Sequence, residues 1–164
     1  MKTLYILRHA KSNWKFEQLS DHDRPLNEQG RSDALLMGQE LASRGVQPDL
    51  IVSSPAVRAL TTAVLVGKEL DYEPRDIEVN DQIYAAGKRD LLEVVQATPA
   101  KVRNLLLVGH NQALSDFANM LSPETLASLP TTGVAAIQFN CDKWNDISRD
   151  NADFLFFDFP KNYK

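Results

Sequence analysis

Continuous apolar runs recur along the first two thirds of the chain. A run of β-favouring residues without polar alternation is typical of a strand that is buried on both faces of a sheet. The pattern predicts strands at residues 3–7, 49–53 and 104–108, with a shorter candidate at 77–79. The run at 104–108 is the most apolar of them.

Helical patterns occupy the intervals between these runs. Asn27 can cap a helix that Gly45 ends. Pro55 stands at the start of a second helix, where its missing N–H costs nothing. Further helical segments are predicted at residues 90–96 and 112–121, and a single turn could follow Pro123.

Strands and helices alternate as far as residue 121, an order typical of a largely parallel sheet. Two late strands, at residues 134–139 and 154–159, have no helix between them, so we expect them to pair antiparallel at one edge. No repeat, low-complexity tract or linker interrupts the pattern. We therefore predict a single α/β domain over residues 1–164. Its sheet is mostly parallel, with helices on both faces and an antiparallel edge at the C-terminal end.

Composition and charge narrow the function classes. Of the 164 residues, 43% are hydrophobic and 24% are charged, the balance of an ordinary globular protein. The basic residues are scattered and the net charge is −4, so the sequence has no basic cluster of the kind that binds nucleic acid. No apolar stretch approaches the roughly 20 residues that span a membrane, and the first run is too short for a signal peptide. The expected location is the cytoplasm.

Cysteine count and ligand spacing exclude further classes. Cys141 is the only cysteine, so no internal disulfide can form. No Cys/His cluster has zinc spacing, and no Asp/Glu run resembles a calcium loop. We expect neither a metal nor another cofactor.

Three predicted strands end in residues with unusual chemistry. The first ends in Arg8 and His9, the second in a Ser-Ser-Pro segment followed by Arg58, and the most apolar one in a Gly-His-Asn segment with His110. Ligands of open α/β sheets bind beyond the carboxyl ends of the strands, where the strand order reverses. We therefore expect two histidines and two arginines to face one crevice.

These residue types suit a phosphoryl group. Guanidinium groups form forked hydrogen bonds to phosphate oxygens, and a histidine can be a nucleophile or a proton carrier near neutral pH. Two arginines and a second histidine could neutralise the charge on a transferring phosphoryl group without a metal. Helix N-termini after Ser54 and Asn111 would add backbone donors. A nucleotide-binding domain is disfavoured because no glycine-rich phosphate loop is present.

The polar segment at residues 9–25 is long for a loop, and long loops are often functional. Its other residues have plainer interpretations. We expect His22 to be structural or solvated and Lys11 to be exposed rather than catalytic. The aromatic pair Trp14 and Phe16 is expected to cap the core rather than to contact a ligand.

Four segments in this order make the chain similar to one known family. It resembles the histidine phosphatase superfamily and, more narrowly, the SixA-like phosphohistidine phosphatases. The segments are LRHAKS at 7–12, DRPL at 23–26 with Gly-Arg at 30–31, SSPAVRALTTA at 53–63, and VGHN at 108–111. The TTG at 131–133 is similar to the family's turn before a late strand. An arginine-histidine pair alone would be a weak signal, whereas the four segments together are a strong one, and the resemblance extends over most of the chain in the same order.

The resemblance implies a role for the residues at the three strand ends. His9 matches the nucleophile that receives the phosphoryl group, and Arg8 and Arg58 match the phosphate clamp. His110 would bind the phosphoryl oxygens or stabilise the transition state.

The resemblance extends to the surrounding residues. Arg24 matches a further phosphate-contacting arginine of SixA-like members. Ser12 and Asn13 are expected to line the pocket entrance, and Ser54 is expected to orient one of the histidines.

One feature of the family is unmatched. Larger, ester-cleaving relatives carry a glutamate, used as general acid, in the loop after the third strand, where this chain reads DQIYAAG at 81–87. Asp81 is the nearest carboxylate there, and capping a helix or turn explains it at least as well. An alkoxide leaving group needs a proton donor, whereas an imidazole can carry its own. A site poor in acids therefore favours cleavage of a P–N bond.

These inferences favour hydrolysis of phosphohistidine on a protein partner, such as a phosphotransfer domain, at a pocket with no cap domain over it. Two alternatives stay open. One is a small-molecule phosphomonoesterase with Asp81 or His22 as the acid, and the other is a non-catalytic module that binds a phosphorylated ligand. Binding alone would not require a nucleophile, so His9 and His110 argue against the second.

Overall fold

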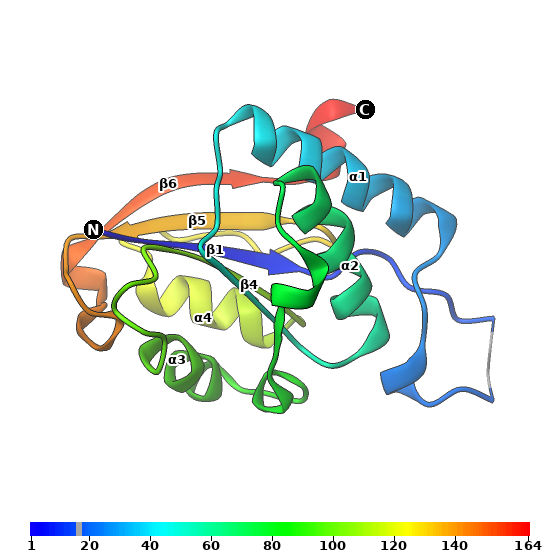
Figure 1. The fold of residues 1–164 in the computed structure, drawn as a ribbon, viewed down its shortest axis with the longest axis horizontal. Coiled ribbons are helices and arrows are strands. Elements are labelled where there is room, and N and C mark those ends of the chain that lie inside the picture. Colours follow the sequence, from blue (N-terminus) through cyan, green and yellow to red (C-terminus); the bar gives the residue numbers. More distant parts are fainter. Residues whose placement is uncertain (16–17) are drawn as a thin grey trace.

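Six strands form one mixed sheet in the order β3-β2-β4-β1-β5-β6 (Figure 1). The computed structural model describes residues 1–15 and 18–164. The strands are β1 (Lys2–Arg8), β2 (Leu50–Ser53), β3 (Glu78–Val79), β4 (Asn104–Gly109), β5 (Val134–Phe139) and β6 (Ala152–Asp158).

The strand directions confirm the predicted α/β class. β1 runs parallel to β4, β4 to β2, and β2 to β3. β5 pairs antiparallel with β1, and β6 pairs antiparallel with β5, so the C-terminal edge is antiparallel as expected. β6 begins at Ala152, two residues earlier than predicted, because Ala152 pairs with Phe139 and extends the ladder.

Helices cover both faces of the sheet, as predicted. They are α1 (Glu28–Ser43), α2 (Val57–Glu69), α3 (Lys88–Gln96) and α4 (Ala113–Leu121). α1 and α2 pack on one face, where Tyr5 and Leu7 point, and α3 and α4 pack on the other with Leu4 and Ile6 (Figure 1). Both faces of β1 are therefore apolar, which is why its sequence does not alternate. No helix in the described part of the chain is long and apolar enough to cross a bilayer.

The helix ends follow local capping chemistry. Asn27 accepts a hydrogen bond from the N–H of Gly30, and Gly45, at φ 77°, follows the end of α1, both as predicted. Pro55 is not the first residue of α2: Ala56 is extended at ψ 136°, and the helix begins at Val57. α3 begins at Lys88, earlier than predicted, because the Asp90 carboxylate accepts from the N–H of Gly87. Residues 122–131 form no helical turn after Pro123.

The chain order places a crevice between β1 and β4. β1 is followed by α1 on one face of the sheet, whereas its neighbour β4 is followed by α4 on the opposite face. The two connections diverge, so the carboxyl ends of these strands border an opening. Arg8 is the register partner of Gly109 across the two strands, so His9 and His110 follow side by side.

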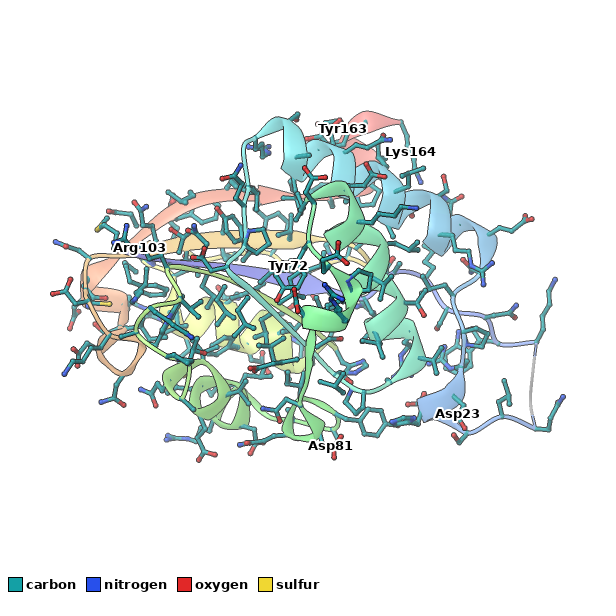
Figure 2. All side chains as sticks on the ribbon, viewed as in Figure 1. Asp23, Tyr72, Asp81, Arg103, Tyr163 and Lys164 are labelled. Atoms are coloured by element: carbon teal, nitrogen blue, oxygen red, sulfur yellow. The ribbon has the colours of Figure 1, made fainter. Side chains whose placement is uncertain are left out.

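The C-terminal turn is held against α1 by two buried carboxylates. Asp158, at the end of β6, accepts hydrogen bonds from Asn162 (2.8 Å), from the Tyr163 hydroxyl and from Arg44 at the C-terminal end of α1 (3.2 Å). Lys164 pairs with buried Asp33 of α1 at 2.7 Å. Figure 2 shows Tyr163 and Lys164 beside this helix.

Gly30 has a steric role where the segment after β1 crosses the first turn of α1. A Cβ at Gly30 would lie 2.1 Å from the Lys11 carbonyl oxygen, a backbone atom that cannot move independently. We expect Gly30→Ala to lower the free energy of unfolding by about 1–3 kcal/mol, as overpacking does, measured by chemical denaturation. Gly87→Ala is the matched control, since the new Cβ would come no closer than 3.7 Å to Asp90. Alanine caps a helix less well than glycine, so this variant should lose only about 1 kcal/mol of unfolding free energy. Equal unfolding midpoints would contradict the steric argument.

Candidate active site

A cavity of about 470 Å³ opens at the carboxyl ends of β1, β2 and β4. Its walls are rich in cationic and imidazole side chains, and none of the described residues that line it is a carboxylate. The lining residues are Arg8, His9, Lys11, Ser12, Trp14, Arg24, Asn27, Arg58, His110, Asn111 and Thr131. The predicted convergence of Arg8, His9, Arg58 and His110 in one crevice is thus confirmed, while their chemical roles stay a prediction.

The segment after β1 differs in part from expectation. Ser12 and Arg24 line the cavity as predicted, but Asn13 lines a neighbouring one, because its side chain accepts from the N–H of Lys15 at 2.8 Å. Trp14 does not cap the core: its side of the loop faces solvent, 73% of the residue is exposed, and its ring covers the guanidinium of Arg24 at 3.5 Å. The prediction for Phe16 lies outside the described residues. Lys11 is exposed, as predicted, and also borders the cavity.

His9 is held in one orientation by the backbone carbonyl of the next residue. Its Nδ1 lies 2.7 Å from the carbonyl oxygen of Ala10, which makes Nδ1 the donor and leaves Nε2 with a free lone pair. The N–H of Ala10 donates to Oγ1 of Thr62, and that hydroxyl donates to the carbonyl of Arg58 at 2.7 Å. Thr62 is fully buried and ties the end of β1 to the helix that carries Arg58.

The surroundings of His9 keep its ring neutral. Burial lowers its pKa from 6.5 to about 4, against the opposing effect of the Ala10 hydrogen bond and with the help of the positive charges of Arg58, Arg8 and Arg24. A neutral imidazole has the lone pair that a nucleophile needs.

His110 is oriented by Ser54. Its Nε2 lies 2.7 Å from Oγ of Ser54, a hydroxyl that also accepts from the N–H of Ala56. Ser54 therefore meets one of the histidines, as predicted, and can donate its proton to Nε2. Burial, followed by the charges of His9 and Arg58, lowers the pKa of His110 to about 3. The two imidazole rings lie 5.2 Å apart.

Buried N–H donors without partners are concentrated in this cavity. The Nε atoms of Arg8, Arg24 and Arg58 and Nδ1 of His110 are buried and have no hydrogen-bond partner among the described residues. An unsatisfied buried donor costs about 1–3 kcal/mol, so these groups favour a hydrogen-bond acceptor within the cavity. An oxyanion with several oxygens would satisfy them.

Asp21 is a site residue that sequence reasoning missed. One of its carboxylate oxygens accepts from Nη2 of Arg24 and the other from Nη2 of Arg58, each at 3.0 Å. The second oxygen also accepts from the Tyr84 hydroxyl at 2.8 Å. Burial acts to raise the pKa of Asp21, but the hydrogen bonds of Arg24 and Tyr84 and the charge of Arg58 outweigh it and hold the pKa well below its usual range. The available signal was an acid three residues before Arg24, the arginine to which the family resemblance assigns a phosphate contact.

A turn after α4 supports the end of β1. The N–H of Thr132 donates to the carbonyls of Arg8 and His9, at 3.2 and 3.1 Å, and Thr132 itself has a positive φ of 61°. The carbonyl of Leu129 accepts from Nη1 of Arg8 at 3.0 Å. Strained backbone of this kind persists where the surroundings hold it, and here it sets the position of the Arg8-His9 pair.

The alternative acids do not reach the cavity. Asp81 is an exposed residue at the start of a short 3₁₀ helix, Asp81–Ile83, at the lower edge of Figure 2. His22 is oriented toward Asp23, with Nδ1 3.2 Å from its carboxylate. Neither side chain lines the cavity. In the described residues, no group of three His, Cys, Asp or Glu side chains could hold a metal ion.

The sequence matches a known family and several uncharacterized relatives. The family described as the histidine phosphatase superfamily (branch 1) matches residues 4–84. An uncharacterized chloroplastic protein of Arabidopsis thaliana is 30% identical over 154 residues, covering 88% of this chain and 70% of that protein. An uncharacterized protein of Mycobacterium tuberculosis is 29% identical over 165 residues, covering 94% and 100%.

Solved structures of SixA proteins have the same fold. The protein histidine phosphatase SixA complexed with tungstate superposes with a TM-score of 0.83 at 25% identity, covering 99% of each chain. The putative phosphohistidine phosphatase SixA of Agrobacterium tumefaciens gives a TM-score of 0.82 at 29% identity, covering 97% of this chain and 98% of its own.

The neutral histidines make stability depend on pH. Between pH 6.5 and about 4 the unfolded chain binds protons on His9 and His110 that the folded chain does not, so their contribution to stability is lost as the pH falls through this window. We expect the free energy of unfolding, in phosphate-free buffer, to decrease over that range, and to decrease less in His9→Gln and His110→Gln. An NMR titration in which either imidazole protonates near 6.5 would contradict this.

Proposed function

The chain belongs to the histidine phosphatase superfamily, branch 1, and on that premise we propose that it is a metal-independent phosphatase that hydrolyses phosphohistidine on a protein partner. The observation that carries the proposal is a group of four buried nitrogens around the neutral ring of His9, none of which has a hydrogen-bond partner among residues 1–15 and 18–164. One cavity thus combines the nucleophile His9 with groups that can bind an oxyanion, and no carboxylate is found among its described lining residues.

In the proposed reaction, Nε2 of His9 attacks phosphorus in line. A P–N bond forms to His9 as the bond to the substrate imidazole breaks, and that imidazole leaves as a neutral ring with the electron pair. The ring of His9 becomes cationic, and the Ala10 carbonyl, 2.7 Å from Nδ1, stabilises the proton that it retains. Water then attacks the phosphoryl group, orthophosphate leaves, and His9 returns to its neutral form.

The proposed clamp consists of the unpaired donors. The Nε–H groups of Arg8, Arg24 and Arg58 would bind phosphoryl oxygens, and Ser54 would keep Nδ1–H of His110 available for another. Preorganised donors of this kind stabilise the charge of the transition state without reorganisation. A SixA protein of the same fold is known as a complex with tungstate, another oxyanion.

The acids around the cavity support P–N cleavage over ester cleavage. A general acid must carry a proton at working pH, and Asp21, the carboxylate that pairs with Arg24 and Arg58, has a pKa far below neutrality. Asp81 and His22 are not in the cavity wall. Without a proton donor an alkoxide leaves slowly, whereas a protonated phosphoimidazole needs none.

The surroundings of the cavity support a protein substrate. A second cavity, of about 230 Å³, adjoins the first and shares Lys11 and Thr131 with it. Its walls include Phe159, Pro160 and Lys161 of the C-terminal turn, and Lys164, whose charge is paired with Asp33 in the same wall. Residues that flank a phosphohistidine in a protein could extend into this second cavity.

The nucleophile can be tested by trapping. We expect acid-labile phosphate on His9 after rapid mixing with a phosphohistidine protein in EDTA, and no turnover in His9→Ala. Arg58→Ala should lose roughly 10²-fold in rate, as after removal of one preorganised donor. Phosphate trapped on another residue, or activity that requires a divalent ion, would refute the mechanism.

The substrate class follows from the missing acid. General acid catalysis is worth about 10²–10⁴-fold, so kcat/KM for a phosphohistidine protein should exceed that for alkyl phosphates by on the order of 10² or more, with activated aryl phosphates between. Asp81→Asn should change phosphohistidine hydrolysis little. Rapid alkyl phosphate cleavage that collapses in Asp81→Asn would favour the phosphomonoesterase, and tight phosphate binding without any turnover would favour the binding module.

A further inference from the structure

Asp21 is the common counter-ion of two buried arginines. The side chains of Arg24 and Arg58 are 9% and 8% exposed, whereas that of Asp21 is 52% exposed at the rim. Its two oxygens each take one Nη2 group, and its backbone carbonyl accepts from Nη1 of Arg58 at 2.6 Å. One residue therefore contacts both guanidinium groups from outside the cavity.

These contacts determine which edge of each guanidinium remains available. Both terminal nitrogens of Arg58 are used by Asp21, and those of Arg24 are used by Asp21 and by Oγ of Ser12. Only the Nε of each arginine is left without a partner among the described residues. A guanidinium is planar and rigid, so fixing its terminal nitrogens also fixes the direction of its Nε–H.

The position of Asp21 is in turn held by Tyr84. The Tyr84 hydroxyl donates to the carboxylate at 2.8 Å, and the Tyr84 ring meets the His110 ring edge-on, with centroids 5.6 Å apart. Asp21 thereby connects the two arginines to the side of the cavity where His110 lies.

We propose that Asp21 is a positioning residue: it holds Arg24 and Arg58 with their Nε–H groups directed to the phosphoryl group of the transition state. The inference rests on the proposed phosphatase function. The proposed role is to orient the two guanidinium groups, not to attract phosphate. A carboxylate beside the arginines in fact reduces the positive potential that attracts an anion to the cavity. Loss of Asp21 should therefore slow turnover without weakening ground-state binding of phosphate.

The test compares Asp21→Asn with Asp23→Asn. Asp23 lies on the same 3₁₀ helix, Asp21–Asp23, at the periphery of Figure 2, and its side chain pairs with His22. We expect Asp21→Asn to lower kcat by about tenfold or more, because misplaced binding groups cost rate, while the inhibition constant of inorganic phosphate is unchanged or lower. Asp23→Asn should match wild type. Tyr84→Phe, which leaves both arginine pairs in place, should lose less than Asp21→Asn.

A second readout is independent of turnover. In phosphate-bound wild type, the Nε–H signals of Arg24 and Arg58 should be sharp in NMR spectra, and they should broaden in Asp21→Asn but not in Asp23→Asn. The proposal is overturned if Asp21→Asn keeps kcat within threefold of Asp23→Asn, or if phosphate affinity, kcat/KM and melting temperature all fall together, as for a purely structural residue. An inactive wild type with these NMR differences would sink the proposed function and leave the role of Asp21 standing.

Discussion

Three guanidinium groups share one small cavity, and the rest of the site is arranged around their charge. Arg24 and Arg58 are buried and Arg8 is half-buried, while the part of the cavity wall that the structure describes contains no carboxylate. Burying cations together is unfavourable unless each finds partners. Asp21 neutralises two of them from the rim, and the Leu129 carbonyl takes one terminal nitrogen of Arg8. The Nε–H groups that remain could donate hydrogen bonds to an oxyanion.

The same concentration of charge determines the state of the histidines. Burial and the neighbouring arginines disfavour a proton on His9 and His110, so both rings are neutral near pH 7. Each ring is then given a single orientation by a hydrogen bond, His9 through the Ala10 carbonyl and His110 through Ser54. A cavity rich in positive charge is thus also one in which a histidine keeps its lone pair. The positive charge of the cavity and the neutral state of its histidines therefore have the same cause, the buried arginines.

The strand order of the sheet brings the arginines and histidines of the site together. Arg8 and Gly109 are register partners on neighbouring parallel strands, and the connections that follow them leave toward opposite faces. Because strands of a parallel sheet end at the same edge, residues about a hundred positions apart arrive within one cavity. Thr62 and the turn at Thr132 then hold the end of β1 from two other elements.

The sequence by itself determined the α/β class, the strand positions, the caps at Asn27 and Gly45, and the residues at the three strand ends. These features depend on local chemistry: apolar runs make buried strands, and a capping side chain acts within four residues of itself. The four family segments added Arg24, since its place in DRPL could be read without coordinates.

Only the tertiary structure decided what depends on contacts between distant segments. Trp14 was expected to cap the core and instead lies exposed with its ring against the guanidinium of Arg24. Asn13 faces a neighbouring cavity, and Asp81 stays outside the wall. Asp21 was invisible as a site residue because its importance lies in joining Arg24, Arg58 and Tyr84, which come from three parts of the chain. A side chain's partners across such distances follow from how the chain packs, and no local pattern of residues encodes them.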